Sequence, residues 1–360
     1  MAMGSTSGNA LKFHRVPFIH RVVQVCANST GAFGALRRNY FTRPVMVFGQ
    51  SLIDGLKSVR PWLDMDERLL SAHVSDDCED PEDEERLEVD VVHTSRLCAL
   101  LQTEKTSQKS EGRGLFQRHG RLAHGADIIV QTGMDLPAHR VLLAARSPVL
   151  RNLIGGSITI VKDATMTVRY QEKGRKLPRV LVTGCHAMTV LLLLEYLYSD
   201  DMPAVWDRRV GIRCGGLFKG LKIDPMQVKA ELEIMARMFH LSSLSVALSS
   251  STKRVPQPTL PTDMHNLFHD PPTPLSAVRP DVFLELGDRR VACHSVILRA
   301  RCPFFRSFFD DEDWTVNRWG SDGTLSVDMK HFEWRAMSFA LTWLYSEGES
   351  ELFEHLGELV

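Results

Sequence analysis

Residues 139–154 read HRVLLAARSPVLRNLI, and residues 294–309 read HSVILRARCPFFRSFF. The two stretches align without a gap, and seven of their sixteen positions are identical. An aspartate precedes each stretch at nearly the same distance, Asp127 in the first case and Asp281 in the second. A repeat of this length predicts two copies of one structural unit in the chain.

The residues around each stretch predict a strand followed by two short helices. In the first copy, residues 127–131 form a short apolar run, and the apolar residues of 138–154 recur at helical spacing. A Ser-Pro pair at 147–148 interrupts this spacing. We expect one helix to end there and another to begin, because serine is a good N-cap and proline is tolerated in a first helical turn. A Cys-Pro pair at 302–303 stands at the same corner of the second copy.

Later features repeat as well. Residues 188–198 read MTVLLLLEYLY and residues 337–345 read MSFALTWLY, and each stretch predicts a helix that ends in Leu-Tyr-Ser before an acidic residue. The first copy has a longer middle, in which residues 161–184 predict a hairpin and a loop, and it continues through helix candidates in 225–248. The second copy has no such helix pair before Val360, so we expect it to be truncated.

Composition limits the kinds of protein that the chain can be. The 360 residues are 44% hydrophobic and 24% charged, with a formal net charge of -1 and a pI near 6.9. This is ordinary globular usage for two or three domains, and no excess of positive charge favours nucleic acid as a partner. The seven cysteines form no CxxC pair, which favours reduced thiols over a disulfide framework or a zinc site. The longest aliphatic run, residues 190–194, is far shorter than the roughly 20 residues of a membrane span. We therefore expect an intracellular protein, cytoplasmic and/or nuclear, that binds neither nucleic acid nor a membrane.

Segments outside the repeats have a different character. Residues 22–25 and 33–36 predict a small hairpin, which needs further strands to bury a face. Residues 76–90 hold ten carboxylates against one arginine, so we expect a solvated, partly disordered linker over 61–120, acidic first and then basic. Residues 249–278 are rich in proline, serine and threonine and predict a second linker.

The order of strand, turn, histidine-led helix, second helix after a Ser-Pro or Cys-Pro pair, sheet and final helix resembles the BTB/POZ domain. Both copies carry the residues on which the resemblance rests, and these residues are our candidates for structural and interface roles: Asp127, His139, Arg146 and Pro148 in the first copy, and Asp281, His294, Arg301 and Pro303 in the second. The resemblance places the first BTB/POZ-like domain at 121–248 and the second at 279–360.

The N-terminal part carries a second resemblance. Residues 21–39 resemble one blade of a regulator-of-chromosome-condensation propeller, so we interpret 1–60 as a degenerate remnant of such a blade. A propeller followed by two BTB/POZ domains is similar to the family typified by the inhibitor of Bruton's tyrosine kinase, which also carries ankyrin repeats. No ankyrin pattern is present in this sequence.

The BTB/POZ resemblance implies an α+β fold, in which each copy is a small three-stranded sheet packed against a cluster of helices. It also implies a protein–protein interaction adaptor that forms homo- or heterodimers through these domains and joins a substrate protein to a cullin-3-type ubiquitin ligase. The alternative is a scaffold or oligomerisation module without ligase function. Neither function requires an enzyme active site, a metal or a cofactor. The family's cullin-contact motif has no clear match in 159–184.

Four polar candidates have both a structural and a chemical interpretation. His139 and His294 could bind a metal or act as general bases, but no second ligand stands at a suitable spacing. We therefore expect structural histidines whose rings bond to nearby backbone. Asp127 and Asp281 could act as acids, but a buried carboxylate is costly without a partner. We therefore expect each to pair with an arginine or a backbone N–H, and Arg140 and Arg146 are the candidates in the first copy.

The helix that follows the second proline is aromatic where its counterpart is aliphatic. We expect a core helix with a partner-facing edge, because its apolar face is wider than one helix usually buries. The partner-facing candidates are Phe304, Phe305, Phe308 and Phe309, which replace Val149, Leu150, Leu153 and Ile154 of the first copy. The two copies should therefore have different partners, or one copy should dock on the other.

Overall fold

The structure is a computed structural model that describes residues 22–37, 50–63, 81–107, 117–118, 121–172, 177–250, 252–311, 315, 318–320 and 322–346. The chain divides into two compact units, Met1–Phe48 and Gly49–Val360. In the first unit, strands β1 (Val22–Ala27) and β2 (Phe33–Arg37) pair antiparallel, which confirms the expected hairpin. Its interpretation as a propeller remnant stays a prediction.

The second unit contains two lobes that share one order of elements: a 3-10 turn, two antiparallel strands, two short helices, a strand parallel to the first, and a helix. The N-terminal lobe, residues 121–248, has a five-stranded sheet in the order β6-β5-β9-β8-β7. Strands β5 and β9 pair in parallel, and the other neighbours pair antiparallel. Its strands are β5 (Ile128–Gln131), β6 (Asp135–Ala138), β7 (Ile160–Lys162), β8 (Thr167–Gln171) and β9 (Arg179–Thr183). Its helices are η2 (Ala123–Gly125), α3 (Arg140–Arg146), α4 (Pro148–Ile154), α5 (Ala187–Ser199), α6 (Arg208–Leu221), α7 (Pro225–Met238) and α8 (Ser242–Leu248). A short pair, β3 (Gln117–Arg118) and β4 (Arg121–Leu122), stands at its start.

The C-terminal lobe, described over 275–346, repeats this order with a smaller sheet. Its three strands lie in the order β11-β10-β12, and β10 and β12 pair in parallel as β5 and β9 do. The elements are η3 (Leu275–Val278), β10 (Val282–Leu286), β11 (Arg290–Cys293), α10 (Ser295–Arg301), α11 (Pro303–Asp310), β12 (Leu325–Met329) and α13 (Trp334–Ser346). The expected truncation concerns residues after Ser346, which lie outside the described residues.

The Ser-Pro and Cys-Pro pairs separate two helices in each lobe, as expected. The hydroxyl of Ser147 accepts a hydrogen bond from the backbone N–H of Leu150 at 3.2 Å, so Ser147 caps α4. Cys302 stands at the equivalent position before α11 but makes no side-chain capping bond. In both lobes, proline opens the second helix, where its missing N–H costs nothing.

Two segments that we expected to be linkers contain helices. The expectation for 61–120 is wrong for α2 (Pro81–Ser107), which packs on α5 and α6. The helix forms despite its acidic start because later apolar residues, among them Leu97 and Leu101, are buried against the N-terminal lobe. The expectation for 249–278 is wrong for α9 (Leu260–His269), which buries Leu260, Met264 and Leu267 at helical spacing.

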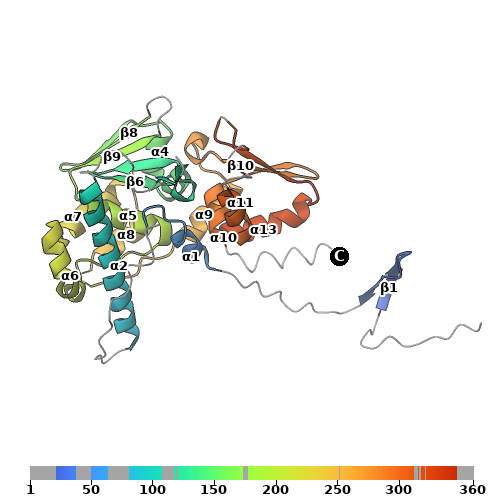
Figure 1. Cartoon of the computed structure of the whole chain (residues 1–360), viewed down its shortest axis with the longest axis horizontal. Coiled ribbons are helices and arrows are strands. Elements are labelled where there is room, and N and C mark those ends of the chain that lie inside the picture. Colours follow the sequence, from blue (N-terminus) through green and yellow to red (C-terminus); the bar gives the residue numbers. More distant parts are fainter. Residues whose placement is uncertain are drawn as a thin grey trace, which may run out of the picture. The chain divides into compact units, whose positions relative to one another are not determined.

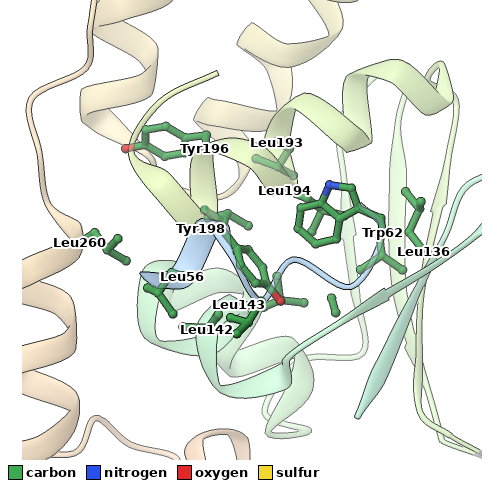
Figure 2. Packing of buried hydrophobic residues seen from close by; sticks show 14 of the residues in the cluster. Leu56, Trp62, Leu136, Leu142, Leu143, Leu193, Leu194, Tyr196, Tyr198 and Leu260 are labelled. Carbon is green, nitrogen blue, oxygen red and sulfur yellow. The ribbon is translucent and has the colours of Figure 1, made fainter. Parts of the chain in front are cut away.

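Helices α1 (Leu52–Lys57) and α9 lie at the junction of the two lobes (Figure 1). Figure 2 shows that α1 and the residues after it contribute to the core: Leu56 and Trp62 belong to the buried cluster that also holds Leu142 and Leu143 of α3 and Tyr198 of α5. The rings of Trp62 and Tyr198 meet edge to face, with 4.9 Å between centroids. Residues 50–63 are therefore part of the second unit rather than of the N-terminal remnant we expected at 1–60.

No helix within the described ranges is long and apolar enough to cross a membrane.

Candidate interaction interface

A buried histidine–tyrosine pair connects α3 to α5 in the N-terminal lobe and α10 to α13 in the C-terminal lobe. In the N-terminal lobe, His139 precedes α3, and its Nδ1 lies 2.7 Å from the hydroxyl of Tyr198 near the end of α5. The backbone N–H of His139 donates to the same hydroxyl at 2.8 Å. In the C-terminal lobe, His294 and Tyr345 make both of these contacts at 2.9 Å. The repeat is therefore preserved in its hydrogen bonds as well as in its strand order.

The hydrogen bonds determine which histidine nitrogen carries the proton. Tyr198 accepts from the backbone N–H of His139, so its single hydroxyl proton is available for Nδ1. Nε2 lies 3.0 Å from the carbonyl oxygen of His124 and donates to it. This neutral tautomer agrees with burial, which lowers the pKa of His139 to about 3 and that of His294 to about 4. Burial likewise raises the pKa of the Tyr198 hydroxyl well above its usual value.

Each histidine also fixes the segment that leads into its own lobe. Nε2 of His139 bonds the carbonyl of His124 in η2, and Nε2 of His294 bonds the carbonyl of Val278 at 3.0 Å, at the end of η3. η2 packs on α10 of the C-terminal lobe, and η3 packs on α3 and α4 of the N-terminal lobe. The two structural histidines therefore hold the turns through which the lobes meet.

The two predicted aspartates hold the starts of the first helices. Asp127 accepts a hydrogen bond from the backbone N–H of Arg140 at 2.7 Å, and its other oxygen lies 3.3 Å from Nε of the same arginine. Asp281 accepts from the backbone N–H of Ser295 at 2.7 Å and also from its hydroxyl. Of the two candidate partners of Asp127, Arg140 pairs with it and Arg146 does not.

Arg146 lies at the end of α3 and binds the start of α9, so we call it the receiving arginine of the N-terminal lobe. Its side chain is 1% exposed, pairs with Asp200 and lies 2.5 Å from an oxygen of Asp263 in α9. It also donates to the hydroxyl of Thr259, the residue before α9, at 2.6 Å. Asp200 in turn accepts from the backbone N–H groups of Thr259 and Leu260 at 2.8 and 2.7 Å. These bonds satisfy the first donors of α9, which a helix leaves unpaired.

Arg301 is the equivalent residue of the C-terminal lobe and binds the start of α1, so it is the receiving arginine of that lobe. Its guanidinium donates to the carbonyl oxygen of Gln50, just before α1, and lies 4.2 Å from the ring centroid of Trp343. Arg306 of α11 donates to the hydroxyl of Ser58, just after α1, at 2.6 Å. The start and the end of α1 are thus both bonded to the C-terminal lobe.

These contacts make the junction reciprocal. Helix α1 precedes the N-terminal lobe and packs between α5 of that lobe and α10 of the other. Helix α9 precedes the C-terminal lobe and packs between α13 of that lobe and α3 of the other. Each lobe thus contributes an equivalent helix, which binds to an equivalent surface of the other lobe. An isologous dimer interface has this form. In this chain, the two sides belong to one polypeptide.

A buried carboxylate holds residues 50–63 and α2 on the N-terminal lobe. Glu195 of α5 is fully buried, pairs with Arg60 and accepts from Nε1 of Trp62 at 2.8 Å. Nε2 of His93 in α2 lies 3.1 Å from its second oxygen. Burial alone would raise the pKa of Glu195, but the hydrogen bond and charge of His93 and the charge of Arg60 hold it below its usual value. Glu195 was not a candidate in the sequence, where it reads as one polar residue in an apolar run.

The four phenylalanines of α11 divide between core and surface. Phe305 and Phe309 are buried, and Phe308 is half-buried. Phe304 is 60% exposed, and its ring stacks on that of Phe308 with 6.0 Å between centroids. A partner-facing role for this edge of α11 stays a prediction.

The described residues contain no group of three or more histidine, cysteine, aspartate or glutamate side chains that could hold a metal ion. A cavity of about 620 Å³ lies between α4, α9 and residues 270–273, and its charged lining residues are Arg151, Asp263 and Asp270.

Comparison with known proteins agrees with this geometry. The family model described as BTB/POZ domain matches two segments of the chain, residues 117–210 and 275–354. Over 358 residues, the chain is 25% identical to BTB/POZ domain-containing protein 1 of Schizosaccharomyces pombe. The match covers 96% of this chain but 24% of that protein, so the chain spans about a quarter of its relative's length. The two lobes thus each contain a segment similar to the BTB/POZ domain, within an α+β structure that has a BTB/POZ-containing relative.

Proposed function

We propose that the protein is an interaction adaptor that uses its BTB/POZ-like lobes to bind other proteins. The observation that carries the proposal is the match of both lobes to one interaction-domain family. The helices α6, α7 and α11 support it, because each of them leaves an apolar side chain exposed for other partners. Exposed apolar side chains on these helices include Ile212, Met226 and Phe304.

Within this proposal, the partner is a cullin-3-type ubiquitin ligase scaffold, to which the adaptor brings a substrate protein. The support is the BTB/POZ resemblance, and no enzyme activity of the chain itself is required. The relation to the ankyrin, propeller and BTB/POZ family belongs to the same proposal, as does an intracellular location in the cytoplasm, the nucleus or both. Fluorescence imaging of the tagged chain tests the location.

Binding of the full chain to purified cullin-3 tests the ligase role. We expect capture at micromolar concentration, with a loss of affinity when Ile212 or Met226 is changed to aspartate. The exposed Val255, which lies in the segment between the lobes, offers the matched control Val255→Asp. If the intact chain captures no cullin at micromolar concentration, the ligase role is wrong.

The second candidate is a scaffold without ligase function, and the reciprocal junction also favours it. Such a scaffold would hold the two lobes in a fixed arrangement for partners other than a cullin. The same binding experiment separates the two functions, since only the ligase adaptor requires cullin binding.

A further inference from the structure

The two helices at the junction correspond residue by residue. Helix α1 follows Ser51 and helix α9 follows Thr259, and both begin with a fully buried leucine, Leu52 and Leu260. From that leucine on, the two helices bury the same positions except the fourth, where Gly55 is buried and Asp263 is half-buried. The fourth residue faces the receiving arginine, and here the helices differ: α1 has Gly55 and α9 has Asp263.

The C-terminal lobe receives α1 at a distance that only glycine permits. A Cβ atom on Gly55 would lie 2.7 Å from the carbonyl oxygen of Ala300 and 3.2 Å from Cδ of Arg301. The first of these atoms belongs to the backbone of α10 and cannot move aside as a flexible side chain would. Helix α10 therefore accepts a junction helix with no side chain at this position.

The N-terminal lobe receives α9 through the carboxylate at the same position. Asp263 lies 2.5 Å from Nη1 of Arg146, whose side chain is 1% exposed. A buried guanidinium requires charged or hydrogen-bonding partners, because its transfer from water is costly. Helix α3 therefore favours a junction helix that carries an acid at the fourth residue.

We propose that Gly55 and Asp263 make the junction specific for unlike lobes, so that each chain pairs its own two lobes and does not dimerise through this surface. In a pair of two C-terminal lobes, α9 of one lobe would lie on α10 of the other, and its Asp263 would clash with the carbonyl oxygen of Ala300. Two N-terminal lobes placed together would give Arg146 a glycine in place of Asp263, so that its buried guanidinium would keep Asp200 and lose its second carboxylate. Both like pairings are thus disfavoured, each for a different physical reason.

The connection between the lobes keeps the unlike pair within one chain. Nζ of Lys253, between α8 and α9, lies 2.6 Å from a carboxylate oxygen of Asp90 in α2 and 3.2 Å from one of Asp201. These ion pairs and the bonds of Thr259 to Asp200 fix the connecting segment to the N-terminal lobe until α9 begins. The segment therefore places the start of α9 next to α3 and Arg146 of its own chain.

This pairing gives the adaptor a composition that a homodimer would not have. One chain presents one N-terminal and one C-terminal lobe, so a partner that recognises either lobe binds with one copy per chain and no second chain in the complex. The inference concerns the pairing of the lobes and goes beyond the proposed function. It holds whichever partner the adaptor binds.

Co-expression of two differently tagged full-length chains tests the inference. We expect that capture through one tag leaves the other chain behind, and that the mass in solution stays at the 40.6 kDa of one chain over a wide concentration range. Recovery of the second chain would overturn the proposal if a change at the junction alters it. Gly55→Asp would abolish a swapped dimer, in which α1 lies on α10 of the other chain, and would strengthen a pair of N-terminal lobes by giving Arg146 an acid. Asp263→Gly would strengthen a pair of C-terminal lobes by removing the side chain that meets Ala300. Recovery that neither Gly55→Asp nor Asp263→Gly alters reports a different surface, and the unfolding midpoints of two glycine variants then decide the proposal.

This pair of glycine variants tests the close approach directly and does not depend on a disruptive change. Gly55→Ala should lower the midpoint of thermal unfolding, because its Cβ meets the backbone of α10. Gly216→Ala in α6 is the matched control, since a Cβ at Gly216 meets nothing within 4 Å, and it should leave the midpoint unchanged or raise it. Equal midpoints for the two variants would contradict the specificity assigned to Gly55.

Discussion

Replacement of Tyr198 by phenylalanine removes one oxygen atom from the hydrogen-bond chain that ties α5 to α3 and η2. The hydroxyl has two partners in the structure, the backbone N–H and Nδ1 of His139, at 2.8 and 2.7 Å. His139 is 2% exposed, so water cannot replace the lost oxygen without entering the core. The phenyl ring keeps the packing against Trp62, so the change isolates the hydrogen bonds.

The magnitude follows from the two groups that the change leaves unpaired. A buried polar group without a partner costs about 1–3 kcal/mol, so Tyr198→Phe should lower the free energy of unfolding by about 2–6 kcal/mol. Tyr170→Phe is the matched control, because the Tyr170 hydroxyl donates to Glu172 at 3.1 Å on the exposed surface, where water can replace it. We expect its effect to stay within about 0.5 kcal/mol.

Equilibrium urea unfolding of the full chain, followed by circular dichroism, measures both variants and Tyr345→Phe. Tyr345 makes the same two bonds in the C-terminal lobe, so its variant should resemble Tyr198→Phe. Hydrogen exchange should show faster opening of η2 in the first case and of η3 in the second. If Tyr198→Phe is as stable as Tyr170→Phe, the histidine–tyrosine pair does not have the role assigned to it.

Three further outcomes follow from other contacts. Arg146→Ala should lower the free energy of unfolding by about 3–5 kcal/mol, because it leaves Asp200 buried without its charge partner. The control Arg179→Ala breaks an exposed pair with Asp135 and should cost at most about 1 kcal/mol. Urea unfolding compares the two variants. Glu195→Ala should make residues 50–63 sensitive to limited proteolysis, because Arg60 and Trp62 lose their shared acceptor, and protection equal to that of the native chain would contradict this anchor. Stability should fall as the pH drops below about 6.5, since the unfolded chain then binds protons that His139 and His294 take up only near pH 3 and 4 when folded; urea midpoints that stay constant between neutral pH and pH 5 would contradict the burial of both rings.

The sequence was informative where a local rule decides the structure. The Ser-Pro and Cys-Pro pairs mark helix boundaries because proline cannot continue a helix, and the structure has boundaries at both. The sequence also led us to expect that the rings of His139 and His294 bond to nearby backbone, and the structure has such bonds to the carbonyls of His124 and Val278. Their tyrosine partners lie 59 and 51 residues away, and only the fold brings them together.

Helix α2 was missed although its periodicity was present. Leu87, Val91, Thr94, Cys98 and Leu101 follow one another at intervals of four, three, four and three residues, which is one face of a helix. The ten carboxylates of 76–90 make the start of this region strongly polar and concealed the apolar face that follows. Tertiary packing on α5 and α6 supplies the stability that the composition of the segment does not predict.

The junction could not be predicted from the repeated residues, because its specificity depends on positions where the copies differ. Identity between the copies, as in the histidines and prolines, identifies the shared fold and therefore permits like pairing as readily as unlike pairing. Gly55 and Asp263 lie before the repeated stretches, in segments whose correspondence becomes visible only when both helices are seen on their receiving arginines. A duplicated domain that must pair with its own copy needs such differences, since identical surfaces would also accept a second chain.

Exchange of the two residues, with Gly55→Asp and Asp263→Gly in one chain, therefore should not restore the native stability. Each receiving surface is adapted to its own helix: the carboxylate would then meet the carbonyl of Ala300, and Arg146 would meet a glycine. A double variant as stable as the native chain would show that the position carries no pairing information.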